Sequence, residues 1–148
     1  MLNNDFRDML SALNAAGAEY LVVGAYALAA HGYPRATGDI DLWIRPTAEN
    51  AERVWDALQA FRAPTSRVTK ADFIEPDVVF QIGIAPRRID LLTSISGVDF
   101  DDAWTRRHTI EVDGLLLDTL SREDLIVNKR ASGRPKDIAD LAWLERGD

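Results

Sequence analysis

The chain has 148 residues, 47% of them hydrophobic and 28% charged, and a net charge of −7. This length allows one well-buried core and predicts a single domain over residues 1–148. Cysteine is absent, which excludes disulfides, thiolate metal sites and a cysteine nucleophile, so any metal must bind oxygen or nitrogen. The negative charge also argues against broad, sequence-independent binding to nucleic acid.

No segment is typical of membrane insertion or export. The longest apolar run, Tyr20 to Ala30, is too short to cross a bilayer. The first eight residues lack the basic and apolar regions of a secretory signal. We therefore expect a cytoplasmic protein with no membrane partner.

The first half of the chain predicts helices alternating with strands. Apolar spacing predicts a helix over residues 4–16 and a strand over 20–23. After a turn at Gly24, we expect a short helix over 25–30, a strand over 37–44 and a helix from a Thr47 cap to 61.

The second half predicts two strand pairs and two helices. Residues 78–84 and 88–93 form the first pair, and 108–112 and 115–117 form the second around an Asp-Gly turn. Ser121 is expected to cap one helix. A last helix from about Lys136 is expected to turn four apolar side chains inward: Ile138, Leu141, Ala142 and Leu144. The fold class is therefore α+β (α/β), with a mixed, mostly antiparallel sheet and flanking helices.

The sequence Asp39-Ile40-Asp41 predicts a carboxylate pair. In a strand alternate side chains share a face, so Asp39 and Asp41 would project together. Such charges repel unless one is protonated or a cation lies between them, and Mg²⁺ prefers oxygen ligands. Asp90, flanked by apolar residues, is the expected third ligand, while the alternative pairs Asp90 with Arg87 or Arg88 at a sheet edge.

Residues near this pair are of the types that hold a triphosphate. The amides of Gly24 and Ala25, at a turn from strand to helix, could bind phosphate. Arg35 and Thr37 stand just before the carboxylates.

The segment from Tyr20 to Ile44 resembles the signature of the nucleotidyltransferase superfamily with the polymerase-β-like fold, in which a turn glycine precedes an Asp-x-Asp strand. It is most similar to the branch containing AbiEii-type toxins and small antibiotic-modifying nucleotidyltransferases. That branch also carries a later pattern of Lys, Arg, Lys-Asp and Asp, which five residues resemble: Lys129, Arg134, Lys136, Asp137 and Asp140.

This resemblance implies transfer of a nucleoside monophosphate from a nucleoside triphosphate to a hydroxyl acceptor with Mg²⁺ or Mn²⁺ as cofactor. Asp39, Asp41 and Asp90 would be the metal ligands, and Lys129 would neutralise the departing pyrophosphate. The nucleotide-binding residues would be Gly24, Ala25, Arg35, Thr37, Arg134 and Lys136, with Asp137 and Asp140 in secondary roles. The helices from about 121 to 146 would complete this site.

The acceptor is left open among RNA, protein and a small molecule, and the chain could be a monomer or a homodimer. A role in a bacterial toxin-antitoxin system, with a cognate protein partner, is consistent with the resemblance. The family usually has Gly or Ser where this chain has Ala25. This difference favours an alternative, a catalytically silent module that binds a nucleotide or a partner protein. An Asp-dependent phosphohydrolase is a third interpretation, but Leu42 and Trp43 lack its following hydroxyl residue.

Overall fold

The computed structural model describes residues 2–33 and 38–146. Within these residues a six-stranded sheet has the order β3-β4-β2-β1-β6-β5. Its strands are β1 (Tyr20–Val23), β2 (Ile40–Ile44), β3 (Val79–Ile82), β4 (Ile89–Leu92), β5 (His108–Val112) and β6 (Leu115–Thr119). The β1·β2, β3·β4 and β5·β6 pairs are antiparallel, whereas β1·β6 and β2·β4 are parallel. The predicted mixed, mostly antiparallel sheet is confirmed.

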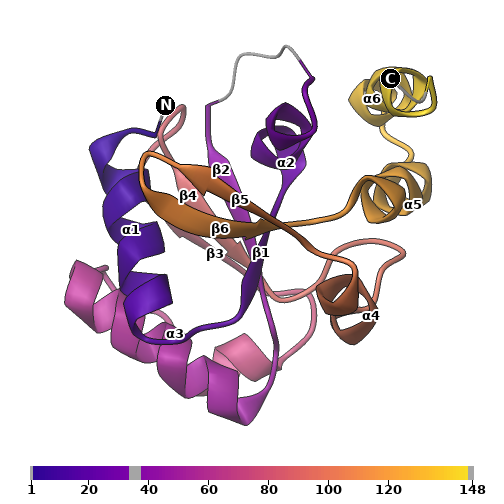
Figure 1. The fold of residues 1–148 in the computed structure, drawn as a ribbon. Coiled ribbons are helices and arrows are strands. Elements are labelled where there is room, and N and C mark those ends of the chain that lie inside the picture. The colour runs from indigo at the N-terminus through magenta and orange to yellow at the C-terminus, as the bar shows by residue number, and fades with distance from the viewer. Residues whose placement is uncertain (1, 34–37, 147–148) are drawn as a thin grey trace.

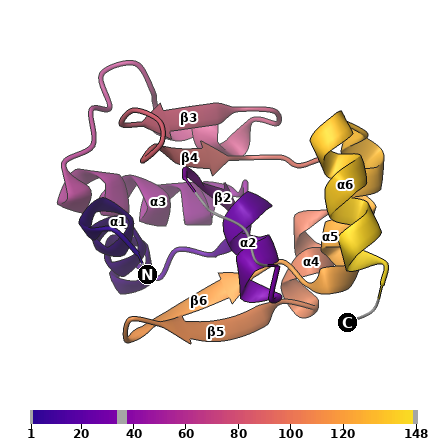
Figure 2. The same cartoon turned by 90° about the horizontal axis from the view of Figure 1, so that it is seen from above.

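Helices cover both faces of this sheet (Figures 1 and 2). They are α1 (Asn4–Ala15), α2 (Gly24–Ala30), α3 (Ala48–Phe61), α4 (Phe100–Thr105), α5 (Arg122–Ser132) and α6 (Pro135–Leu144), with a 3₁₀ turn η1 at Lys70–Ile74. Figures 1 and 2 show α1 and α3 together on one side and α4, α5 and α6 together on the other. The central strands are therefore buried on both faces, as the fully buried β1 shows.

Two clusters of apolar side chains hold these layers together. On one face, Phe6, Met9, Leu10 and Leu13 of α1 are fully buried against α3 and the sheet. On the other face, Trp43 of β2 packs edge-on to Phe100 of α4 with ring centroids 4.9 Å apart. Burial of such apolar area is the main term that stabilises the fold.

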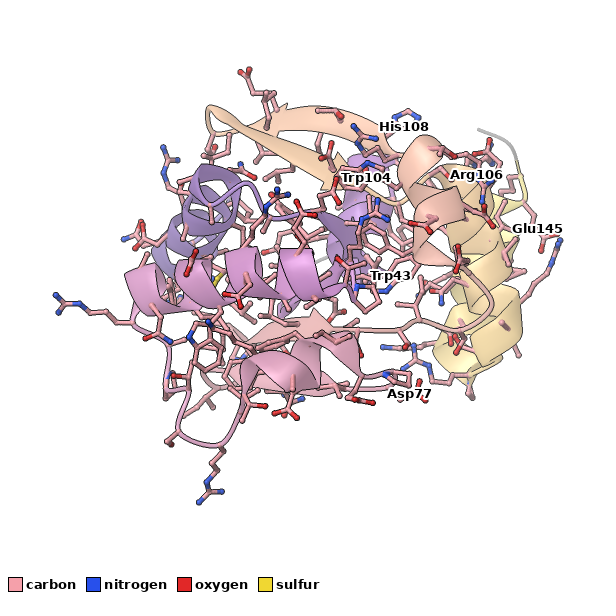
Figure 3. The ribbon with its side chains drawn as sticks, turned by 90° about the horizontal axis from the view of Figure 1, so that it is seen from below. Trp43, Asp77, Trp104, Arg106, His108 and Glu145 are labelled. Carbon is pink, nitrogen blue, oxygen red and sulfur yellow. The ribbon has the colours of Figure 1, made fainter. Side chains whose placement is uncertain are left out.

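An ion pair at the end of α4 joins this helix to α5. Figure 3 labels Arg106, which follows α4. Its Nε and Nη2 atoms donate to the Asp124 carboxylate at 3.1 and 2.9 Å. Asp124 lies in the first turn of α5, and its amide donates to Oγ of the Ser121 cap at 3.1 Å. The predicted Ser121 cap is therefore confirmed, whereas the sequence patterns did not predict α4 or η1 because both are short.

Two details of the predicted elements were wrong. The strand predicted over 37–44 begins at Ile40, so Asp39 precedes the strand, and residue 37 lies outside the described residues. The last helix does not turn all four predicted apolar residues inward. Ile138 is 65% exposed and Ala142 is exposed, whereas Leu144 and two carboxylates, Asp137 and Asp140, are buried.

No helix among the described residues is long and apolar enough to span a membrane.

Candidate active site

The register of two parallel strands brings two of the predicted carboxylates together. β2 pairs with β4 so that Asp41 lies directly opposite Asp90. Neighbouring residues in register share a face of the sheet, so both side chains project to the same side. Asp90 is buried and Asp41 is half-buried.

This proximity changes the acidity of Asp41. Burial, the negative charge of Asp90 and a hydrogen bond with its side chain raise the pKa of Asp41 to about 6. The positive charge of Lys136 opposes the shift, and Asp39 adds to it. The positive charge of Lys136 therefore does not fully offset the effect of burial and of the neighbouring carboxylates on the ionised form of Asp41.

Asp39 reaches the same place from just outside the strand. Its Oδ1 accepts a hydrogen bond of 2.8 Å from the backbone N–H of Arg88. The amide of Ile40 in turn donates to the Arg88 carbonyl at 3.0 Å. The backbone before β2 is therefore fixed against the backbone before β4, which places Asp39 beside Asp90.

The side chain of Arg88 lies against these carboxylates. Its Nε and Nη2 atoms donate to the two oxygens of Asp90 at 2.7 and 3.1 Å. Nη2 also lies 3.3 Å from Oδ2 of Asp39. Asp90 therefore pairs with Arg88 and not Arg87, but β4 lies between β3 and β2, so the expected location at a sheet edge was wrong.

The turn after β1 lies against Asp41. Gly24 has a φ of +68°, a left-handed conformation that side-chain-bearing residues rarely adopt. A Cβ atom at this position would overlap Oδ2 of Asp41. Glycine is therefore required twice here, for the backbone angle and for the close approach of the carboxylate. Ala25 follows within the first turn of α2.

The C-terminal helices contribute a buried cation. Lys129 of α5 is only 5% exposed, and its Nζ lies 3.2 Å from Asp137 and 3.2 Å from Asp140. A buried ammonium group is costly unless it is paired, which explains why α6 turns two carboxylates inward. Apolar periodicity alone predicted that Ile138 would face inward. Periodicity along one helix carries no information about the side chains of a neighbouring helix, here Lys129 of α5.

Arg134 is the N-cap residue of α6 and is held by Asp137, one of the two carboxylates that pair with Lys129. Its backbone N–H and its Nε both donate to Oδ2 of Asp137, at 3.2 and 2.8 Å. Burial opposes ionisation of Asp137, but the hydrogen bonds from Arg134 and Lys129 outweigh it and lower the pKa of Asp137. Asp137 therefore links Lys129 to Arg134.

These segments enclose one polar cavity of about 410 Å³. Its acidic lining residues are Asp39, Asp41, Asp90 and Asp140, its basic ones are Arg88, Lys129, Arg134 and Lys136, and Gly24, Ala25 and Gly38 complete it. Most of the residues predicted for the site therefore line a single cavity. Arg35 and Thr37, the other two predicted nucleotide-binding residues, lie outside the described residues.

A second space of about 460 Å³ adjoins this cavity and shares Gly24, Asp41, Lys129 and Arg134 with it. Its further walls mix apolar and hydroxyl or amide side chains, among them Leu92, Ile95, Ser96, Asn128 and Ser132. The Nδ2 atom of Asn128 donates to the Ser96 carbonyl at 3.0 Å and joins the two walls. The charged cavity thus opens into a less charged one.

A family model described as "Nucleotidyltransferase of unknown function (DUF6036)" matches residues 2–144. The chain belongs to this nucleotidyltransferase family. The match covers both strand-borne carboxylates and the C-terminal helices that close the cavity.

Two solved structures are similar to this chain. A "putative nucleotidyltransferase (TM1012)" from Thermotoga maritima is similar with a TM-score of 0.61 and 16% identity, over 99% of this chain and 94% of that one. At this identity the likeness establishes the nucleotidyltransferase fold. An antigenic nucleotidyltransferase-like protein from Paracoccidioides brasiliensis matches with a TM-score of 0.49 and 18% identity, over 97% of this chain and 77% of that one. Among proteins with curated descriptions, none matches.

The three aspartates in the cavity of this nucleotidyltransferase family member have the kind of ligand atoms that bind a divalent cation. Asp39, Asp41 and Asp90 offer only oxygen, which Mg²⁺ and Mn²⁺ favour, and burial together with the negative charge of Asp90 raises the pKa of Asp41. Within residues 2–33 and 38–146, however, no three acidic or histidine side chains converge as metal ligands. The guanidinium of Arg88 lies against two of the three carboxylates.

Sequence reasoning did not assign Arg88 to the site. The signal was present, since Arg88 stands two residues before Asp90 and such residues share a face of an extended segment. The chain has two histidines, which are far apart in the sequence. The fold brings the His31 and His108 rings to a centroid separation of 5.1 Å, with His31 Nε2 2.8 Å from the Leu120 carbonyl oxygen.

Proposed function

We propose that the chain transfers a nucleoside monophosphate from a nucleoside triphosphate to a hydroxyl acceptor, with Mg²⁺ or Mn²⁺ as cofactor. One observation carries this proposal: Asp39, Asp41 and Asp90 share a cavity with the Gly24 turn and with three cations of the C-terminal segment. A cavity that contains both carboxylates and cations suits a metal-bound triphosphate, because the carboxylates can hold the metal and the cations can bind the phosphates.

In this proposal the metal ligands are Asp39, Asp41 and Asp90. The bound cation would neutralise the triphosphate and stabilise the charge that develops during transfer. Asp90, which is buried and adjoins Asp41 in register, would also accept the proton of the acceptor hydroxyl.

The basic residues act on the phosphate groups. Lys136 and Arg134 line the cavity, and the side chain of Arg134 is 59% exposed. Lys129 lies deeper, where a point charge can stabilise the departing pyrophosphate. The turn at Gly24 and Ala25 gives backbone amides access to the same phosphates.

The reaction balances without a further reactant. The acceptor oxygen forms a bond to the α-phosphorus, and the bond from that phosphorus to the bridging oxygen of the β-phosphate breaks. Pyrophosphate leaves, and the hydroxyl proton passes to a carboxylate. In-line attack of this kind depends mainly on positioning and charge stabilisation.

The acceptor belongs to one of three classes, RNA, protein or a small molecule. The adjoining space lined by Ile95, Ser96 and Asn128 offers room beside Asp41 for the nucleoside or the acceptor. The pattern of Lys129, Arg134 and Asp140 supports placement near the AbiEii-type toxins and the small antibiotic nucleotidyltransferases. A toxin of a two-gene system, acting with a cognate protein partner in the cytoplasm, is the biological role that we propose.

A second function is favoured by two observations. Ala25 supplies no hydroxyl to a phosphate, and Arg88 lies on two of the three carboxylates. Both features suit a catalytically silent module that binds a nucleotide or a partner protein.

Calorimetric titration of the four ribonucleoside triphosphates, with and without Mg²⁺, separates these functions. The wild type is compared with Asp41→Asn, which keeps the size of the side chain, and with Asp101→Asn, an exposed aspartate remote from the cavity. The proposal expects binding that needs Mg²⁺ and is lost only in Asp41→Asn. Binding that persists without Mg²⁺ and in Asp41→Asn supports the silent module.

A further inference from the structure

The contacts of Arg88 resemble those of a cation that carboxylates would otherwise bind. Its guanidinium donates twice to Asp90, at 2.7 and 3.1 Å, and approaches Asp39 at 3.3 Å. These are two of the three carboxylates that the proposed function assigns to the metal. Bidentate pairs of this kind are strong and directional, so they fix the orientation of the carboxylate oxygens.

The side chain of Arg88 has room to move away from these carboxylates. The backbone of Arg88 is fixed by its hydrogen bonds to Asp39 and Ile40. The side chain, by contrast, is 29% exposed and lines the same cavity as Lys129 and Lys136. A rotation about its side-chain bonds would therefore redirect the guanidinium within the cavity without disturbing the sheet.

A divalent cation and this guanidinium would compete for the same oxygens. Both are positive and both need the lone pairs of Asp39 and Asp90, so simultaneous binding would place two cations in close contact. Once released, a guanidinium in this cavity matches the geometry of a phosphate group, which it can bind through two parallel hydrogen bonds.

We propose that Arg88 is a resident counter-ion of the carboxylates, which divalent metal displaces and which then binds the phosphates of the nucleotide. This inference rests on the proposed function. It assigns Arg88, which holds two of the three carboxylates, a part in coupling metal binding to nucleotide binding.

The proposal predicts effects of opposite sign on two ligands. Arg88→Met removes the competitor, so Mn²⁺ alone should bind about tenfold more tightly, the effect of losing one charge-assisted hydrogen bond that opposes binding. The same change removes a phosphate ligand, so the complex of Mg²⁺ with a nucleoside triphosphate should bind about tenfold more weakly. A merely structural role of Arg88 would weaken both.

The test measures Mn²⁺ binding by electron paramagnetic resonance and calorimetry, and nucleotide binding by calorimetry. Arg87→Met is the matched control, because it removes the same charge from the adjacent, exposed residue. Opposite shifts in Arg88→Met, with small changes in Arg87→Met, support the proposal. Equal tightening of Mn²⁺ in both variants reflects net charge alone and overturns it.

A measurement on the wild type does not depend on the folding of a variant. The Nε–H proton of Arg88 bonds to Asp90, and that of Arg106 bonds to Asp124, outside the cavity. Titration with diamagnetic Mg²⁺ should shift the ¹⁵N resonance of Arg88 Nε and leave that of Arg106 unchanged. An unchanged Arg88 resonance at Mg²⁺ concentrations that bind the protein overturns the proposal.

The same data separate failure of this inference from failure of the proposed function. If the wild type binds the Mg²⁺ nucleotide complex but Arg88→Met binds Mn²⁺ no more tightly, only the counter-ion role is wrong. If neither protein binds Mn²⁺ or nucleotide, the proposed function fails and the counter-ion role fails with it.

Discussion

Lys129 and Asp137 are eight residues apart in the chain and form an ion pair inside the protein, with Nζ 3.2 Å from Oδ1. Their side chains are 5% and 0% exposed. The pair joins α5 to α6 and holds the lysine at the wall of the polar cavity. The stability of the C-terminal helices and the charge of the candidate site therefore depend on the same atoms.

Loss of Lys129 should destabilise the fold strongly. Lys129→Met keeps the length of the side chain but leaves Asp137 and Asp140 without their shared cation, and breaking a buried pair costs about 3–5 kcal/mol. Urea unfolding measures the change. Arg130→Met is the control, because that arginine pairs with Glu145 at the surface with its side chain 59% exposed, and such pairs contribute at most about 1 kcal/mol. Equal losses in both variants would contradict the importance of the buried pair.

Acid sensitivity should depend on Asp137. Its pKa is lowered in the folded protein, so its ionised form stabilises the fold at pH values above the unfolded pKa of about 3.9. That contribution is lost as the pH falls toward the folded pKa. Asp137→Asn should therefore be less stable than the wild type at pH 7, with a difference that shrinks below about pH 4.

Urea unfolding between pH 2.5 and 7 tests this expectation. Glu145→Gln serves as the control, since its carboxylate is 45% exposed in a surface pair. A constant difference between Asp137→Asn and the wild type across this range would show that Asp137 acts only by packing.

The turn at Gly24 should be intolerant of a side chain for a reason beyond its backbone angle. Gly24→Ala introduces a Cβ that overlaps Asp41, whereas Gly17→Ala introduces one at a φ of +72° with nothing within 4 Å. Both substitutions should cost about 1–3 kcal/mol of backbone strain. Only Gly24→Ala should also abolish binding of the Mg²⁺ nucleotide complex, as calorimetry can show. Retained binding in Gly24→Ala would contradict the placement of the ligand beside Asp41.

Ala25 offers a test by gain of function. Ala25→Ser introduces a hydroxyl at a position where the resemblance to nucleotidyltransferases implies Gly or Ser, and one added hydrogen bond contributes about 0.5–1.5 kcal/mol. The dissociation constant of the Mg²⁺ nucleotide complex should fall by about three- to tenfold. Ala25→Cys is the control, because it has nearly the same shape with a much weaker donor. If serine and cysteine have equal effects, the hydroxyl makes no contact with the nucleotide.

Local patterns in the sequence were sufficient for most of the elements. The alternation around Asp113 and Gly114 predicted the β5·β6 hairpin, whose turn residues have φ values of +52° and +83°. Ser121 was recognised as a cap because capping depends only on residues within one turn. The short α4 had no such signal, and its packing on Trp43 comes from a distant part of the chain.

The sequence by itself determined the local elements and the identity of Asp39, Asp41, Asp90 and Lys129 as candidate site residues. Both follow from spacing within a strand or a helix and from the resemblance to nucleotidyltransferases. The sequence also allowed the pairing of Asp90 with Arg88 as an alternative. The tertiary structure alone decided that the same guanidinium reaches Asp39 and that α6 turns Asp137 and Asp140 inward instead of Ile138. The physical reason is that a buried charge selects its partner through space, and neither periodicity nor spacing along the chain records what lies across a strand pair or between two helices.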